Sequence, residues 1–148
     1  MGPPSASSFH DTARPCKELQ ILLIDDEPDF RSALATILRE DGHVVREFAS
    51  PTDLPPLAEL ADVRVLITDY DMPGENGVAF AARFHAMYPS ALVVLITGDW
   101  TRWPEEYSGA YTYLHVCQKP VDYDHLHAEL HAWATAVPVA GRVPRRIN

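Results

Sequence analysis

The chain has 148 residues, of which 47% are hydrophobic and 22% are charged, a mix typical of one globular domain and not of a disordered chain. Its formal net charge is −9, so a nucleic-acid surface over the whole domain and a surface for anionic membrane lipid are not expected. No apolar run approaches the roughly 20 residues of a membrane span, so no membrane partner is expected either. Cys16 and Cys117 have neither a zinc-ligand spacing nor a disulfide framework, which predicts a reducing, cytoplasmic location.

The two ends of the chain differ in composition from its middle. Residues 1–18 are rich in Pro, Ser and Ala and predict a flexible N-terminal segment. Residues 138–148 contain three arginines and predict a flexible basic tail. A single domain is therefore expected over residues 19–137.

Strand and helix patterns alternate in the first half of this domain. The apolar run 19–24 predicts a buried parallel strand, and apolar positions at helical spacing over 30–38 predict a helix that ends at a glycine. Residues 44–48 predict a second strand. Residues 50–61 are expected to be helical only in part, as a short helix that has Asp53 as its N-cap and two prolines in its first turn.

The same alternation continues in the second half. Three further apolar runs predict strands, over 63–68, 91–96 and 114–118. Between them, residues 78–87 predict a helix that ends before a proline, and residues 100–113 are ambiguous, with a short helix as one interpretation. Asp122 is expected to cap a last helix with an apolar stripe. The order predicts an α/β fold, a doubly wound five-stranded parallel sheet flanked by about five helices.

Chemically active side chains follow four of the predicted strands. They are Asp25, Asp26 and Glu27 after the first, Asp69 and Asp71 after the third, Thr97 after the fourth and Lys119 after the fifth. In a doubly wound sheet the carboxyl ends of the strands line one crevice, so these side chains should converge. Taken singly, an acidic pair or a Lys-Pro is more often a solvated turn, but four such features at four strand ends favour a functional site.

The residue types in this crevice indicate phosphoryl chemistry. Clustered carboxylates need a cation or protons to neutralise them, and hard oxygen ligands together with a phosphate favour Mg²⁺. A hydroxyl from Thr97 and an ammonium from Lys119 could hold phosphate oxygens while a carboxylate attacks phosphorus.

Four segments suggest a family. They are IDDEP at 24–28, DYDMPGENG at 69–77, ITG at 96–98 and KP at 119–120. With these, residues 19–136 resemble the receiver domain of two-component response regulators, which has a flavodoxin-like fold. Such domains are signalling modules and not enzymes in the ordinary sense, apart from their own phosphorylation and slow dephosphorylation.

The resemblance implies roles for individual residues. Asp69 would be the phosphoacceptor, with Thr97 and Lys119 contacting the phosphoryl oxygens. Asp26 and Asp69 would bind Mg²⁺ directly, Asp25 through water and Asp71 through its backbone carbonyl. The implied partners are a sensor histidine kinase or a histidine phosphotransfer protein, a downstream protein target and a phosphorylation-dependent dimer, with no direct contact to nucleic acid.

Two features depart from that family's pattern. The family usually has an aromatic switch residue three positions before the lysine, and here that position is Val116. Thr97 and Val116 are thus the candidate switch positions. Trp100 and Trp103 lie close together in the segment of the fourth helix, and they are either a partner-binding patch or a cover for the sheet.

An enzyme is the alternative. An Asp-x-Asp after an apolar strand, as at Asp69 and Asp71, also resembles the nucleophile motif of haloacid-dehalogenase-like aspartyl phosphatases. That family has its nucleophile strand first and an acidic pair after the lysine. Here the acidic pair comes first and no acidic strand end follows Lys119, so the order favours the receiver domain.

Overall fold

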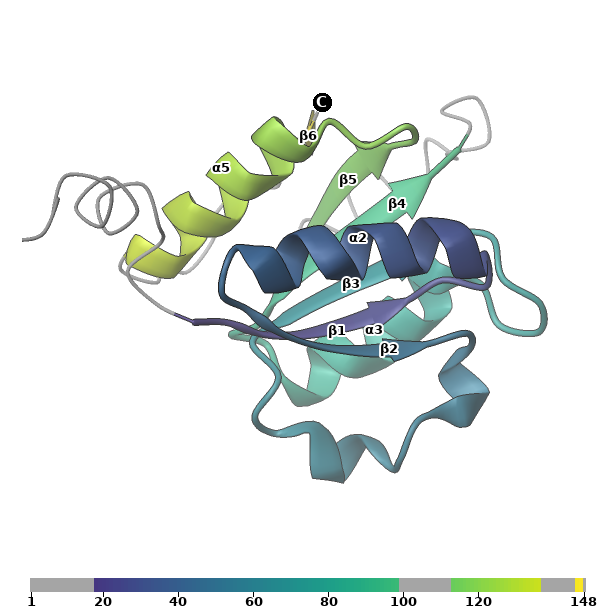
Figure 1. Cartoon of the computed structure of the whole chain (residues 1–148). Helices are drawn as coiled ribbons and strands as arrows, with labels where there is room; N and C mark the ends of the chain where they lie inside the picture. Colours follow the sequence, from purple (N-terminus) through teal and green to yellow (C-terminus); the bar gives the residue numbers. More distant parts are fainter. Residues whose placement is uncertain (1–17, 99–112, 137–145, 148) are drawn as a thin grey trace, which may run out of the picture.

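A parallel sheet with helices on both faces forms the body of the molecule (Figure 1). The computed structural model describes residues 18–98, 113–136 and 146–147. The strand order is β2-β1-β3-β4-β5-β6 and every pairing is parallel. The strands are β1 (Gln20–Ile24), β2 (Val44–Phe48), β3 (Val65–Asp69), β4 (Leu92–Thr97), β5 (Leu114–Gln118) and β6 (Arg146–Ile147). The five predicted strands and the doubly wound arrangement are confirmed.

Helices cover both faces of the sheet. Each face has its own apolar core, because successive strand residues point to opposite sides. Helices α2 (Pro28–Glu40) and α5 (Tyr123–Thr135) cover one face, where Leu38 and Leu130 are fully buried (Figure 1). Helix α3 (Gly77–Met87) covers the other face through Phe80 and Phe84. The buried strands β1, β3 and β4 contribute side chains to both cores, so they are near-continuous apolar runs in the sequence.

The helix ends have identifiable causes in the sequence. The Asp122 carboxylate accepts the backbone N–H of His125 at 3.3 Å, which confirms the predicted cap of the last helix. Asn76 caps α3 in the same way by accepting the N–H of Ala79 at 2.8 Å. Gly42 follows the C-cap of α2 and has a φ of 98°, a left-handed conformation that favours glycine.

Residues 50–61 are helical only in part, as predicted, but the predicted short helix with Asp53 as its N-cap is wrong. Two short 3₁₀ helices stand there, η1 (Pro51–Asp53) and η2 (Leu57–Leu60), and the N-cap is Ser50 rather than Asp53. Pro55 and Pro56 supply no backbone N–H, so the hydrogen bonds of a continuous α-helix cannot form across them.

The tail differs from the prediction. The described residues contain three α-helices and two 3₁₀ helices, and residues 99–112, where a further helix was one interpretation, lie outside the described ranges. Two residues of the predicted flexible tail form β6, which pairs with β5 at Val116 and Cys117. A two-residue strand has no periodicity that a sequence pattern could reveal. In the part of the chain that the structure describes, every helix is too short or too polar to cross a bilayer.

Candidate functional site

The predicted strand-end residues lie at one edge of the sheet. Asp69 is the last residue of β3 and pairs with Ile96 of β4, so Thr97 stands one residue further along. Backbone hydrogen bonds continue past the strand ends, since Lys119 N donates to the Thr97 carbonyl at 2.8 Å. The parallel register therefore brings the phosphoacceptor candidate, the hydroxyl and the lysine together, as the rule for doubly wound sheets predicts.

Three carboxylates meet at this edge. One oxygen from each of Asp25, Asp26 and Asp69 lies within 4.8 Å of the other two. Asp25 and Asp69 are buried and Asp26 is exposed, so the cluster is open to solvent on one side. A set of hard, anionic oxygen donors at this spacing suits a divalent cation of the Mg²⁺ type, which keeps several waters and takes a few carboxylates.

Lys119 is the cation of the cluster. Its Nζ atom lies 2.6 Å from Glu27 Oε1, 3.1 Å from Asp25 Oδ2 and 3.8 Å from Asp69 Oδ1. The ammonium also lies 4.3 Å from the centre of the Phe30 ring. The side chain is only 18% exposed, so these contacts are poorly screened by solvent. Lys119 is therefore held within reach of Asp69, although its shortest contact is to Glu27.

The cluster contains more negative charge than Lys119 balances. Burial, reinforced by the charge of Asp25, raises the pKa of Asp69 to about 7 against the attraction of Lys119. Burial likewise raises the pKa of Asp25. The hydrogen bond from Lys119 lowers the pKa of Glu27. Burial opposes the charge on Lys119, but its acidic neighbours outweigh burial and raise the pKa of the ammonium. A further cation would relieve the repulsion between the two buried aspartates.

The loop between β3 and α3 packs tightly against the end of β3. A Cβ atom on Gly77 would lie 2.1 Å from the Asp69 carbonyl oxygen, a distance that no side chain tolerates. Gly77 N donates to the Tyr70 carbonyl at 2.9 Å, and the backbone N–H of Asp71 donates to the Asp69 carboxylate. Glycine at 77 is therefore required for α3 to start beside the phosphoacceptor candidate.

The remaining predicted residues fall into two groups. Asp71 is exposed at the rim, and Val116 is buried in β5 beside Leu95 of β4, with 7% of its surface accessible. Trp100 and Trp103 lie outside the described residues.

Two residues near the site, Phe30 and Arg31, were not predicted from the sequence. Phe30 contacts Lys119, and Arg31 contacts the backbone of Asp25. Glu27 was expected at this edge, but its contact with Lys119 was not. The IDDEP motif contains Glu27, but nothing in the motif shows that its side chain turns toward a lysine 92 positions away.

Comparison with known proteins decides the family. The family model for the response regulator receiver domain matches residues 21–131. The chain belongs to the response regulator receiver domain family. Members of this family are signalling modules of two-component systems that are characteristically phosphorylated on an aspartate. The match also decides between the two families that the Asp-x-Asp motif resembles.

Solved receiver domains have the same fold as this one. The receiver domain of the hybrid histidine kinase CckA is 28% identical, with a TM-score of 0.64, over 78% of this chain and 99% of that one. The response regulator TrrA from Thermotoga maritima, solved in complex with Mg²⁺-BeF, is 22% identical with a TM-score of 0.66, over 78% and 98% of the two chains.

The curated relatives are longer regulators. The hydrogenase transcriptional regulatory protein HoxA of Bradyrhizobium diazoefficiens is 36% identical over 78 residues, which are 53% of this receiver domain's chain and 16% of HoxA. The transcriptional regulatory protein TcrA of Mycobacterium tuberculosis is 28% identical over 124 residues, 82% of this chain and 48% of TcrA. The chain thus spans about a sixth to a half of the length of these relatives.

Proposed function

We propose that this receiver domain takes a phosphoryl group onto Asp69 from a phosphohistidine of a sensor histidine kinase or a histidine phosphotransfer protein. A carboxylate oxygen of Asp69 forms the new O–P bond while the P–N bond to the donor imidazole breaks, and the imidazole nitrogen takes a proton from water. The observation that supports this most is the convergence of Asp25, Asp26 and Lys119 on the Asp69 carboxylate.

The acidic residues would hold Mg²⁺ for this reaction. Asp26 and Asp69 would be direct ligands, Asp25 a ligand through water, and the Asp71 backbone carbonyl the last protein ligand. When bound, Mg²⁺ supplies positive charge beside the attacked phosphorus. The raised pKa of Asp69 supports this proposal, because a carboxyl that titrates near pH 7 needs added positive charge to be fully ionised as a nucleophile.

Lys119 and Thr97 would hold the phosphoryl oxygens. The ammonium of Lys119, 3.8 Å from Asp69 Oδ1, can shift from Glu27 toward a phosphoryl oxygen because Glu27 is an exposed partner and the lysine stem is flexible. The Thr97 hydroxyl would donate to a second oxygen. Both contacts stabilise charge that develops on phosphorus-bound oxygens in the transition state.

The proposed signalling unit is the domain over residues 19–137, acting in the cytoplasm through contacts with a downstream protein or with a second copy of itself. Val116 leaves no aromatic ring to rotate between buried and exposed positions. We therefore propose that displacement of Thr97 and Lys119, whose backbones are hydrogen-bonded at 2.8 Å, conveys phosphorylation to β4 and β5.

Incubation with acetyl phosphate and Mg²⁺ tests this function. Intact-protein mass spectrometry should show the addition of a single phosphoryl group that depends on Mg²⁺ and is absent from Asp69→Asn. The matched control Asp62→Asn removes an exposed carboxylate that precedes the start of β3, at the other end of the strand from Asp69, and should be modified like the wild type. Modification of Asp69→Asn to the wild-type extent, or no Mg²⁺ dependence, would overturn the proposal.

A further inference from the structure

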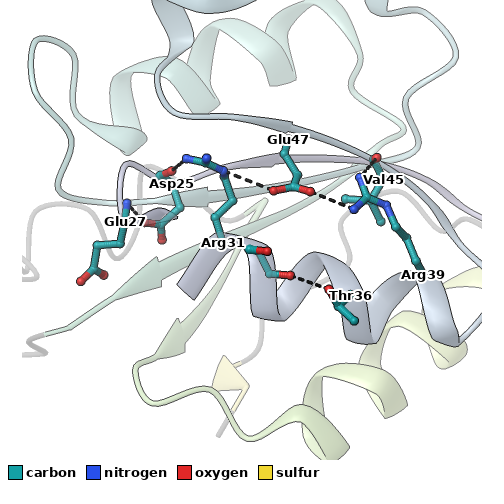
Figure 2. Close-up of polar contacts among 8 residues, drawn as sticks. Asp25, Glu27, Arg31, Thr36, Arg39, Val45 and Glu47 are labelled. Atoms are coloured by element: carbon teal, nitrogen blue, oxygen red, sulfur yellow. Dashed lines mark hydrogen bonds and ion pairs between the residues drawn. The ribbon is translucent and has the colours of Figure 1, made fainter. Parts of the chain in front are cut away.

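Three charged residues outside the predicted site form a chain of ion pairs between α2 and β2 that reaches the acidic loop (Figure 2). Arg39 Nη1 donates to Glu47 Oε2 at 2.8 Å, and Arg39 Nη2 donates to the Val45 carbonyl oxygen at 2.7 Å. The other carboxylate oxygen of Glu47 accepts from Arg31 Nε at 3.4 Å. Arg31 Nη1 in turn donates to the backbone carbonyl oxygen of Asp25 at 2.7 Å.

Arg31 contacts the chain on both sides of Asp26. Its guanidinium bonds the carbonyl of Asp25, and its own backbone N–H donates to the carbonyl of Glu27 at 2.9 Å. The N–H of Asp25 is also satisfied, since it donates to the Phe48 carbonyl of β2 at 3.1 Å. The backbone that carries the two aspartates is thus tied to α2 and to β2 at three points.

This tie opposes a repulsion that the site itself creates. Asp25 and Asp69 are both buried, and a carboxylate oxygen of each lies within 4.8 Å of the other, so the like charges repel and an unrestrained loop would relax by moving its carboxylates apart. Arg31 meets the loop at a carbonyl and not at a carboxylate, which leaves the side chains of Asp25 and Asp26 directed to the cluster.

The chemistry of arginine suits this position. A guanidinium presents several N–H groups in a rigid plane and can bond the loop carbonyl and Glu47 at once, whereas a lysine ammonium is a point charge without that fork. The Arg31 side chain is 19% exposed and that of Glu47 is 24% exposed, so water competes weakly for these bonds.

We propose that Arg31, held in place by Glu47, is a positioning residue that presents the Asp25 and Asp26 carboxylates to the cation site in a preformed arrangement. The inference rests on the proposed function of the acidic cluster and adds to it a residue that touches neither the cation nor the phosphoryl group. Residues that orient ligands without binding the metal commonly change affinity by about 10- to 100-fold when replaced.

Binding of Mg²⁺ and of Ca²⁺, measured by calorimetry at neutral pH and constant ionic strength, tests the proposal. The variants are Arg31→Lys, which keeps the charge and loses the fork, and Glu47→Gln, which weakens the hold on Arg31. The matched control is Arg46→Gln, because Arg46 neighbours Glu47 on β2 and pairs with the exposed Asp62 at 3.1 Å. Urea unfolding of each protein gives its stability separately.

Arg31→Lys should bind Mg²⁺ about tenfold more weakly than the wild type. Its affinity for Ca²⁺ should fall less, because Ca²⁺ tolerates irregular ligand geometry that Mg²⁺ does not. The affinity of Glu47→Gln for Mg²⁺ should also fall, by a smaller factor, and Arg46→Gln should bind both ions with wild-type affinity.

Two results would overturn this inference alone. One is a folded Arg31→Lys with wild-type Mg²⁺ affinity. The other is a loss of stability with an unchanged ratio of Mg²⁺ to Ca²⁺ affinity, which is what a merely structural role produces. A wild-type protein that binds no Mg²⁺ would instead overturn the proposed function, and this inference with it.

Discussion

Replacement of Asp69 by asparagine should stabilise the metal-free protein, and more strongly at high pH. Burial and Asp25 raise the pKa of the Asp69 carboxyl from 3.8 to about 7. Between these two values the unfolded chain has lost the proton that the folded chain keeps, so the free energy of unfolding falls as pH rises and levels off above about 7. Integrated over the shift, the carboxyl costs about 2 kcal/mol at about pH 5.5 and about 4 kcal/mol at about pH 8.

Urea unfolding in the presence of a chelator measures this difference. Asparagine has no proton to lose, so the stability gap between Asp69→Asn and the wild type should widen by about 2 kcal/mol from about pH 5.5 to about pH 8. Added Mg²⁺ should narrow the gap, since an ion that binds the folded wild type stabilises it. As a control, replacement of the exposed Asp62 by asparagine should change the free energy of unfolding by the same amount at both pH values. A gap that stays constant or narrows with rising pH would refute the assignment of the repulsion to Asp69.

Other predictions concern the supports of the site and the core. Gly77→Ala should destabilise the protein by about 1–3 kcal/mol in urea unfolding, because its Cβ would meet the Asp69 carbonyl oxygen; wild-type stability would contradict the close approach. Burial lowers the pKa of His43. Below about pH 6.5 the unfolded chain therefore binds a proton at this histidine that the folded chain does not bind, and the free energy of unfolding should fall as the pH falls. His43→Asn should flatten that part of the pH profile, and an unchanged profile would argue against this source. Glu27→Gln removes the shortest contact of Lys119 and should speed phosphorylation by acetyl phosphate about two- to fivefold, whereas a slower reaction would show that Glu27 aids the lysine instead of competing for it.

The strands and the convergence of the site could be predicted from the sequence because parallel buried strands are continuous apolar runs and their carboxyl ends share an edge. Residues as distant in the sequence as Asp25, Asp69 and Lys119 could therefore be placed in one cluster. In the structure, Lys119 Nζ lies 3.1 Å from Asp25 Oδ2 and 3.8 Å from Asp69 Oδ1. The cap at Asp122 is also predictable, because its hydrogen bond to the N–H of His125 is local in the sequence.

Features that depend on tertiary contacts could not be predicted in this way. The division of the expected helix is instead a local effect, because Pro55 and Pro56 lack the backbone N–H groups that a continuous α-helix needs. The pairing of Arg31 with Glu47 and the turn of Glu27 toward Lys119 join different elements, and neither follows from the spacing of residues along one element.

A structure of the protein with Mg²⁺ and beryllofluoride would test the central claim most directly. Beryllofluoride should be attached to Asp69, with Thr97 Oγ1 and Lys119 Nζ on its fluorine atoms and the metal between it and the carboxylates of Asp25 and Asp26. A metal bound elsewhere, beryllofluoride absent from Asp69, or Lys119 still paired with Glu27 and away from the fluorines would contradict the account.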